Sequence, residues 1–326
     1  MKILVTGGAG YIGSHTSSLL LARGHQVVVY DNLSTGFKEA IPKDSRFIFG
    51  DVRDRDLLRR VMRDHQIEAV IHFAAKLIVP ESVEKPYEYY ETNVLGGMNV
   101  AWACAETGVK ALVFSSTAAV YGNPDRVPVT EDAPLRPLNP YGKSKAMVEE
   151  ILRDFDHRYG VRFVSLRYFN VAGAAADLSN GQRTKNATHL IKVAAEVACG
   201  KRPFLTIFGT DYPTLDGTGV RDYIHVEDLA VAHLLALEYL VDGGTSLVLN
   251  CGYGHGFSVR QVVETMRRES QIHFATEDGP RRPGDAAEIV ADSTRLRKIL
   301  GWVPQHDDLG FICRTAVQWE RKLNSP

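Results

Sequence analysis

The chain has 326 residues, of which 38 are basic and 39 acidic, so its net charge is close to zero at neutral pH. This balance gives no electrostatic reason to expect a nucleic acid or a charged membrane surface as a partner. A hydrophobic content of 44% is ordinary for a globular protein, and the length predicts one or two domains.

The sequence shows no pattern typical of a targeting segment or a metal site. Residues 1–6 form a short apolar run that ends in Gly7, unlike a signal peptide, and no apolar run approaches the roughly 20 residues of a spanning helix. We expect a cytoplasmic protein with reduced thiols, because its four cysteines lie far apart. No metal is expected, since the histidines lack metal-ligand spacing, and His72 and His225 lie in apolar strands typical of core histidines.

A glycine-rich turn follows the first predicted strand. Residues 2–6 predict a short buried strand, and the sequence Gly-Gly-Ala-Gly-Tyr-Ile-Gly at 7–13 opens an apolar-periodic helix that ends near residue 24. A second predicted strand, 26–30, ends at Asp31. A strand, glycine turn, helix, strand and acid within about 30 residues are the context that a dinucleotide-binding fingerprint requires.

Each feature of this turn can serve a dinucleotide. Gly7 permits the tight turn, Gly10 lets backbone approach a pyrophosphate, and Gly13 lets helix pack close to strand. The helix N-terminus presents unpaired N–H groups to phosphate oxygens. Asp31 can accept hydrogen bonds from a ribose and would repel a 2′-phosphate, so NAD is expected rather than NADP. The alternative is a glycine turn that binds nothing.

Strands and helices continue to alternate along the first half of the chain. We predict strands at 46–50, 69–73, 110–116 and 161–168, and helices at 57–65, 87–107 and 141–159. This order predicts an α/β protein with a doubly wound parallel sheet of the Rossmann type. Ligands bind beyond the carboxyl ends of such strands. The residues that follow strand ends should therefore share one crevice: Gly7–Gly13, Asp31, Asp51, Ala74, Thr117 and Asn170.

Tyr141 and Lys145 form a predicted acid–base pair. Pro140 disfavours helix before it, so a helix should begin near Tyr141 and place Lys145 four residues later on the same face. A nearby ammonium favours the phenolate and lowers the pKa of a tyrosine, which could then take a proton from a substrate hydroxyl. The alternative is a surface Tyr and Lys that only share a face.

The second half of the chain has a different pattern. Residues 174–187 show no strong period; helices are predicted at 189–199, 259–269 and 315–322, and strands at 223–225 and 247–251 could rejoin the sheet. We expect residues 1–173 to form the nucleotide-binding domain, rejoined by about 222–252. Residues 174–326 should mainly form a smaller, interleaved α/β domain that binds the substrate.

Several stretches together resemble the extended short-chain dehydrogenase/reductase family, and within it the UDP-glucose 4-epimerases. Shared features are the glycine turn, Asp31, the hydroxyl run at 115–117 and the Tyr141/Lys145 pair. More specific stretches span nearly the whole chain: 31–34 (Asp-Asn-Leu-Ser), 121–122 (Tyr-Gly), 166–170 (Leu-Arg-Tyr-Phe-Asn), 217–226 (Gly-Thr-Gly-Val-Arg-Asp-Tyr-Ile-His-Val) and 281–285 (Arg-Arg-Pro-Gly-Asp).

The resemblance implies an isomerase of galactose metabolism. It implies that UDP-glucose and UDP-galactose interconvert through a 4-keto sugar, with tightly bound NAD, in a homodimer formed by the 87–107 and 141–159 helices. Tyr141 would remove the 4-hydroxyl proton, assisted by Thr117, while Lys145 holds the nicotinamide ribose. The implied NAD-binding residues are Gly7, Gly10, Tyr11, Ile12, Gly13, Asp31, Asn32, Asp51, Val52, Phe73, Ala74, Ala75, Asn93, Tyr141, Lys145 and Phe169. The implied substrate-binding residues are Thr117, Tyr141, Asn170, His189, Leu190, Arg221, Tyr223, Arg282, Asp285 and Ile289.

Physical chemistry supports part of this assignment and leaves alternatives open. Arginine forks suit pyrophosphate oxygens, although Arg281 and Arg282 could be a solvated pair, and Asn93 could be a buried helix cap. Ala118 and Ala119 cannot supply the acid and base of a sugar dehydratase. Other UDP-sugars (UDP-N-acetylglucosamine, UDP-xylose, UDP-glucuronate) remain alternative substrates, and a non-catalytic NAD-binding sensor remains a rival of another class.

Overall fold

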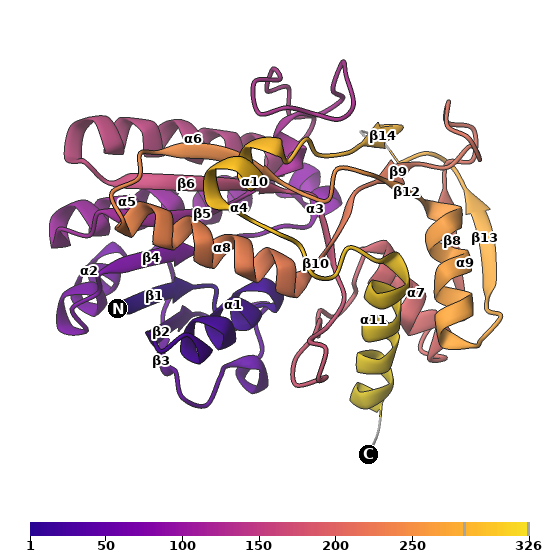
Figure 1. Cartoon of the computed structure of the whole chain (residues 1–326), viewed down its shortest axis with the longest axis horizontal. Coiled ribbons are helices and arrows are strands. Elements are labelled where there is room, and N and C mark those ends of the chain that lie inside the picture. Colours follow the sequence, from indigo (N-terminus) through magenta and orange to yellow (C-terminus); the bar gives the residue numbers. More distant parts are fainter. Residues whose placement is uncertain (283–284, 325–326) are drawn as a thin grey trace.

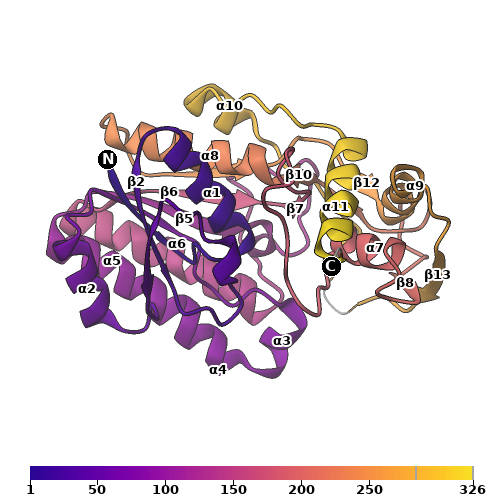
Figure 2. The same ribbon diagram turned by 90° about the horizontal axis from the view of Figure 1, so that it is seen from below.

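The computed structural model describes residues 1–282 and 285–324, and it has two regions that are distinct in both views (Figures 1 and 2). A large parallel sheet with helices on both faces forms one region. A smaller group of strands and helices lies at the other end of the molecule, with the C-terminal helix among them.

The large sheet has seven strands in the order β3-β2-β1-β4-β5-β6-β11, and every neighbouring pair is parallel. The predicted doubly wound sheet is thus confirmed, because strand order reverses beside β1. Its strands are β1 (Lys2–Thr6), β2 (Gln26–Asp31), β3 (Arg46–Phe49), β4 (Ala69–His72), β5 (Ala111–Thr117), β6 (Arg162–Tyr168) and β11 (Leu247–Cys251).

Helices cover both faces of this sheet, so its strands are apolar on both sides. In β1, Ile3 and Val5 belong to one buried cluster and Leu4 to another, as the two-residue period of a strand requires. Helices α1 (Tyr11–Ala22) and α8 (Val226–Val241) pack together on one face. The other face carries α2 (Arg55–Asp64), α5 (Gly96–Thr107) and α6 (Pro140–Tyr159).

The long helix predicted at 87–107 is broken into pieces. Two short helices, α3 (Val79–Glu84) and α4 (Pro86–Tyr89), lead into a π-helical stretch, Tyr90–Leu95, before α5 begins at Gly96. The π-helical stretch contains Asn93, whose side chain bonds to a neighbouring loop instead of lying on a regular helix face. Such wide turns inside helices are frequent at functional sites.

The smaller region is built from short sheets and three helices of the described chain. Strand β7 (Asn170–Ala172) pairs with β10 (Tyr223–His225), so the prediction that residues 223–225 rejoin the large sheet is wrong, whereas 247–251 does rejoin it as β11. The remaining strands are β8 (Phe204–Phe208) with β13 (Ala275–Gly279), and β9 (Val220–Arg221) between β12 (Phe257–Ser258) and β14 (Glu288–Ile289). Its helices are α7 (Leu190–Ala198), α9 (Val259–Ser270) and α11 (Leu309–Asn324), whereas α10 (Thr294–Leu300) packs on α8 and β11 of the large region.

Helix α8 is a feature that the sequence analysis missed. It is buried at most of its positions, against α1 on one side and strands of the sheet on the other. A helix that is apolar nearly all round has no single apolar face, so its period is weak. Helix α11 also begins six residues before the predicted start at 315. None of the described helices combines the length and the apolar character that crossing a membrane demands.

Candidate functional site

Close backbone packing requires glycine at two of the three predicted positions of the turn. Gly7 has φ +72°, and a Cβ there would lie 2.6 Å from the backbone N of Ala74. A Cβ on Gly13 would lie 2.3 Å from the Gly7 carbonyl oxygen. A Cβ on Gly10 would lie 3.2 Å from the Gly7 carbonyl oxygen, so the backbone around Gly10 is less crowded. Gly10 also offers no side-chain cap to α1, and the first turn of that helix contains no acidic residue.

Asp31 ties the end of β2 to this turn. One carboxylate oxygen accepts a hydrogen bond from Ala9 N–H at 3.0 Å and the other from Leu33 N–H at 2.8 Å. Burial raises the pKa of Asp31, and these two N–H groups counter that rise. The carboxylate is held at the helix N-terminus, where partial positive charge favours an anion. Each of its oxygens keeps a lone pair that a ribose hydroxyl can use.

Asp51 follows the end of β3 and is hydrogen-bonded to Asn32, the residue after Asp31. Asn32 Nδ2 donates to Asp51 Oδ2 at 2.8 Å, and Arg53 pairs with the same carboxylate. The hydrogen bond from Arg53 lowers the pKa of Asp51 to about 2, so Asp51 is ionised at neutral pH. Val52 follows it and is buried. Three of the predicted NAD-binding residues, Asn32, Asp51 and Val52, thus lie close together after the ends of β2 and β3.

Asn93 fixes the loop that follows β4. Its side chain accepts from Lys76 N–H at 2.8 Å, and it donates to the Lys76 carbonyl at 3.0 Å and to Ser144 Oγ at 2.9 Å. Asn93 therefore holds the loop that carries Phe73, Ala74 and Ala75 against α6, and the alternative of a helix cap is wrong. The Lys76 ammonium itself pairs with Glu88.

Thr117 and Tyr141 meet at the carboxyl end of β5. Asn139 caps α6 by accepting a hydrogen bond from Gly142 N–H at 2.9 Å, and Pro140 occupies the first turn, so the helix begins where the sequence predicted. Burial raises the pKa of Tyr141, while a side-chain hydrogen bond with Thr117 lowers it. The phenol therefore has one hydroxyl partner of the kind that a substrate alcohol would join.

The surroundings of Lys145 and Tyr141 show that the predicted lowering of the Tyr141 pKa is wrong. Its ammonium donates to the Ser115 carbonyl at 2.8 Å and lies 4.8 Å from the centre of the Phe114 ring. Burial lowers the pKa of Lys145 to about 7, and Glu149 counters that shift. The pKa of Tyr141 is raised rather than lowered, because desolvation of its phenolate dominates and Thr117 is the group that opposes it.

A buried ion pair behind these residues was missed by the sequence analysis. Arg167 of β6 donates to both carboxylate oxygens of Glu149, at 3.0 and 2.5 Å, and to Tyr121 Oη at 2.9 Å. Ser116 Oγ donates to the same carboxylate at 2.5 Å. This network locks α6 against β5 and β6. The sequence contained one signal for this ion pair: Glu149 follows Lys145 by four residues and so lies on the same helix face, which points toward the sheet.

Two arginines gather in the smaller region. Arg221 Nη2 lies 4.0 Å from Asp285 Oδ1, and the Arg282 guanidinium lies 4.0 Å from the centre of the Phe208 ring. Desolvation lowers the pKa of Arg282, Asp285 raises it, and the like charge of Arg221 lowers it further. One carboxylate thus faces two cations, and an added anion would relieve their repulsion.

Neighbouring residues complete this anion-favouring cluster. Burial and the charge of Arg282 lower the pKa of His189, which stands immediately before α7 and Leu190. Arg281 does not join the cluster, because it pairs with Asp211 at 2.7 Å on the surface. For Arg281, the alternative of a solvated arginine is therefore the one that the structure supports. Pro283 and Gly284, quoted in the same motif, lie outside the described residues.

A set of short strands connects this cluster to Thr117. Tyr223 pairs in register with Asn170, and a hydrogen bond from Asn170 lowers the pKa of Tyr223 against the larger rise from burial. Ile289 pairs in register with Arg221. Ile289 also packs against the buried cluster that contains Phe169 and Ala118, the residue after Thr117. The structure therefore brings Ile289, and with it Arg221, to the end of β5 where Thr117 lies.

Comparison with known proteins agrees with this arrangement. Residues 3–252 match the model of the NAD dependent epimerase/dehydratase family. The chain belongs to this family. A UDP-glucose 4-epimerase of Azospirillum brasilense is 54% identical over 99% of this chain and 92% of its own length.

Solved structures of this family superpose closely on the chain. The UDP-glucose 4-epimerase of Brucella ovis in complex with NAD is 43% identical, covers 97% of both chains and has a TM-score of 0.95. The UDP-glucose 4-epimerase of Bifidobacterium longum in complex with NAD+ and UDP is 37% identical, covers 99% of this chain and 98% of its own, and has a TM-score of 0.94.

Proposed function

We propose that this chain interconverts UDP-glucose and UDP-galactose, using NAD held at the glycine turn. The observation that carries the proposal is the convergence of the Thr117/Tyr141 pair with the Arg221/Arg282 cluster at one edge of a sheet that begins with the glycine turn. The relatives and solved structures described above carry the same activity in their names. Family membership makes NAD the expected cofactor.

The residues around the glycine turn fit NAD. The backbone at Gly10 and the uncapped N-terminus of α1 suit a pyrophosphate, and Asp31 suits an adenine ribose without a 2′-phosphate. The segment after β7 folds over this turn, since Tyr11 Oη donates to the Gly173 carbonyl at 2.6 Å and Asn180 Nδ2 to Ser14 Oγ at 2.7 Å. This cover supports tight retention of the cofactor.

The chain's own residues can perform the proton transfer. NAD, when bound, would accept a hydride from carbon 4 of the sugar and return it. Tyr141 would take the 4-hydroxyl proton and give it back, since one group can act as base and then as acid. Thr117 would hold the same oxygen through its hydroxyl. The positive charge of an oxidised nicotinamide would favour the Tyr141 phenolate, and Lys145 would hold the ribose next to it.

The arginine cluster fits the diphosphate of a nucleotide sugar. Arg221 comes from β9 and Arg282 from the loop after β13, and together they carry more positive charge than Asp285 neutralises, which suits a dianionic pyrophosphate in two-point contact. Asn170, His189, Leu190 and Tyr223 would contact the remainder of the nucleotide. This division of roles supports a nucleotide-binding region of residues 1–173 and a substrate-binding region of mainly 174–326.

Oligomeric state and location are part of the same proposal. Helices α5 and α6 would form the homodimer interface, and they expose the apolar side chains of Met98 (39%) and Met147 (46%). A cytoplasmic location is supported by four cysteines that are all free thiols. Sedimentation equilibrium that reports a monomer at micromolar concentration would contradict the dimer.

An isotope experiment tests the proposed reaction. Purified protein is incubated, without added cofactor, with UDP-glucose that carries deuterium at carbon 4, and the product is analysed by NMR. We expect UDP-galactose with the deuterium retained at carbon 4, because the hydride returns to the carbon that it left. Release of stoichiometric NADH, or loss of deuterium to water, would contradict an epimerase. A lack of turnover on every UDP-sugar tried would favour the non-catalytic NAD-binding sensor.

A further inference from the structure

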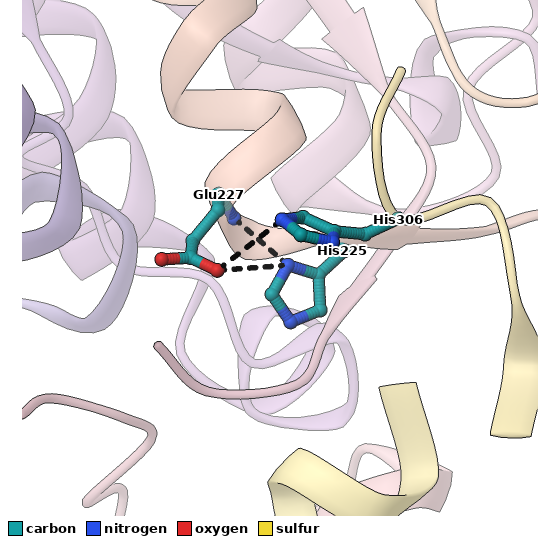
Figure 3. Close-up of side chains that lie close together, drawn as sticks. All are labelled: His225, Glu227 and His306. Atoms are coloured by element: carbon teal, nitrogen blue, oxygen red, sulfur yellow. Dashed lines mark hydrogen bonds and ion pairs between the residues drawn. The ribbon is translucent and has the colours of Figure 1, made fainter. Parts of the chain in front are cut away.

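Two imidazoles and one carboxylate meet outside the site described above, at the N-terminal end of α8 (Figure 3). His225 is the last residue of β10, Glu227 lies in the first turn of α8, and His306 comes from the segment between α10 and α11. Their ligand atoms lie within 4.8 Å of one another. We propose that these three side chains form a binding site for a divalent transition-metal cation, with Zn²⁺ as the best match.

The separations are close to those of a metal site. Glu227 Oε2 lies 3.8 Å from His225 Nδ1 and 3.5 Å from His306 Nε2, and both contacts are drawn in Figure 3. Ligand atoms of a tetrahedral zinc site, each about 2.1 Å from the metal, are roughly 3.4 Å apart. The two distances to Glu227 are therefore within a few tenths of an ångström of this value, and the two imidazoles, within 4.8 Å of each other, would move closer together on binding the metal.

His225 is in the protonation state that a metal ligand needs. Its Nδ1 accepts a long hydrogen bond of 3.3 Å from Glu227 N–H, so the ring proton resides on Nε2, which lies 3.4 Å from Thr315 Oγ1. Metal-binding histidines are commonly oriented by such a partner on the second nitrogen. The metal would replace the long Glu227 N–H bond.

The other two ligands are held in place and remain accessible. Asp228 accepts from the backbone N–H of Gln305 at 2.8 Å and of His306 at 2.9 Å, which fixes the segment that carries the second imidazole. The His306 ring stacks on Phe311 at 4.6 Å. The side chains of His306 and Glu227 are 26% and 34% exposed, which leaves an entry path and room for a water as the fourth ligand.

The ligand types decide which cation fits. Two imidazoles and one carboxylate suit Zn²⁺ and its transition-metal neighbours, whereas Mg²⁺ and Ca²⁺ prefer all-oxygen sites. A bound cation would join β10, α8 and the segment before α11, so it should stabilise the junction between the two regions. The sequence analysis expected no metal, because His306 is too distant along the chain to give a recognisable spacing.

Calorimetric titration of ZnCl₂ into chelator-treated protein without a polyhistidine tag tests the proposal. We expect one tight equivalent in the wild type and an affinity at least tenfold weaker in both His306→Gln and Glu227→Gln. His273→Gln and Glu264→Gln, which change exposed residues outside the cluster, should bind Zn²⁺ within twofold of the wild type. Zn²⁺ should also raise the melting temperature of the wild type but of neither cluster variant.

Two outcomes would overturn this site. One is a wild type with no saturable Zn²⁺ binding, and the other is a pair of cluster variants that bind Zn²⁺ as the control variants do. The two variants remove different ligands, so if one fails to fold the other still decides the question. Substitution with Co²⁺ provides an independent reading, because its visible absorption reports tetrahedral coordination in the wild type and should be absent in the folded variant.

Discussion

The cofactor side and the nucleotide-sugar side of the candidate site differ in how deeply their polar residues are buried. Asn93, Lys145 and Asp31 are 2%, 3% and 7% exposed, and each has hydrogen-bond partners within the protein. Arg221 and Asp285 have side chains that are 17% and 41% exposed, and their mutual contact is long at 4.0 Å. The cofactor side is thus preorganised by the fold, whereas the nucleotide-sugar side is open to an incoming anion.

The largest expected effect comes from breaking the buried network of the cofactor side. Glu149→Ala should cost about 3–5 kcal/mol of unfolding free energy, because it leaves the Arg167 charge buried without its partner. Glu150→Ala is the matched control on the same helix, since its contact with Arg153 is exposed and should contribute less than about 1 kcal/mol. Urea denaturation of both variants measures the difference, and equal losses would contradict it.

The next effect separates chemistry from substrate binding. Tyr141→Phe should lower turnover by about 10²-fold or more, the usual scale for loss of a general base, while the affinity for UDP changes little. Tyr159→Phe, at the far end of the same helix, serves as the control. Steady-state kinetics and calorimetry with UDP provide the two readings. Turnover near the wild-type rate in Tyr141→Phe would reject this tyrosine as the base.

A smaller effect is expected on the open side, without loss of stability. Arg221→Ala should weaken UDP binding by about 2 kcal/mol, the low end for a charge pair, because the side chain is partly exposed. Arg282→Ala should cost less, about 1–2 kcal/mol. Arg281→Ala should leave UDP affinity unchanged, since Arg281 pairs with Asp211 on the surface. Unchanged calorimetric affinity in both Arg221→Ala and Arg282→Ala would contradict the diphosphate site.

The smallest effect concerns the boundary between the two sides. The resemblance implies that Ile289 lines the sugar pocket, at a place where a bulky tyrosine would exclude N-acetylated sugars. Ile289 is intermediate in size, so activity on UDP-N-acetylglucosamine should be poor but detectable. Ile289→Gly should raise it by about tenfold, the low end for a change in pocket volume. Ile272→Gly, at an exposed position, is the control, and no gain in Ile289→Gly would show that this side chain is not the gate.

The first half of the fold could be predicted because its signals are local. The turn at Gly7–Gly13 lies between two short apolar strands, and the α6 helix begins at its proline with an asparagine cap. Short-range patterns of this kind depend on neighbouring residues, which the sequence displays directly. Helix α8 escaped prediction because burial on nearly all sides removed its period.

The candidate site was less predictable wherever its partners are distant along the chain. Nothing near Asn93 in the sequence shows that its amide would hold the loop at Lys76 and contact Ser144. The pKa of Tyr141 was expected to fall because of Lys145, but burial raises it, and burial is a property of the whole fold.

The sequence by itself determined the parallel sheet, the position of the glycine turn and the spacing of Tyr141 and Lys145, because each depends on residue types within a few turns of chain. Only the tertiary structure decided which charges face one another. Arg221 meets Asp285, Glu149 meets Arg167, and His225 and Glu227 meet His306. Electrostatic energies depend on distance and solvent exposure, and both are fixed only when separate segments pack together.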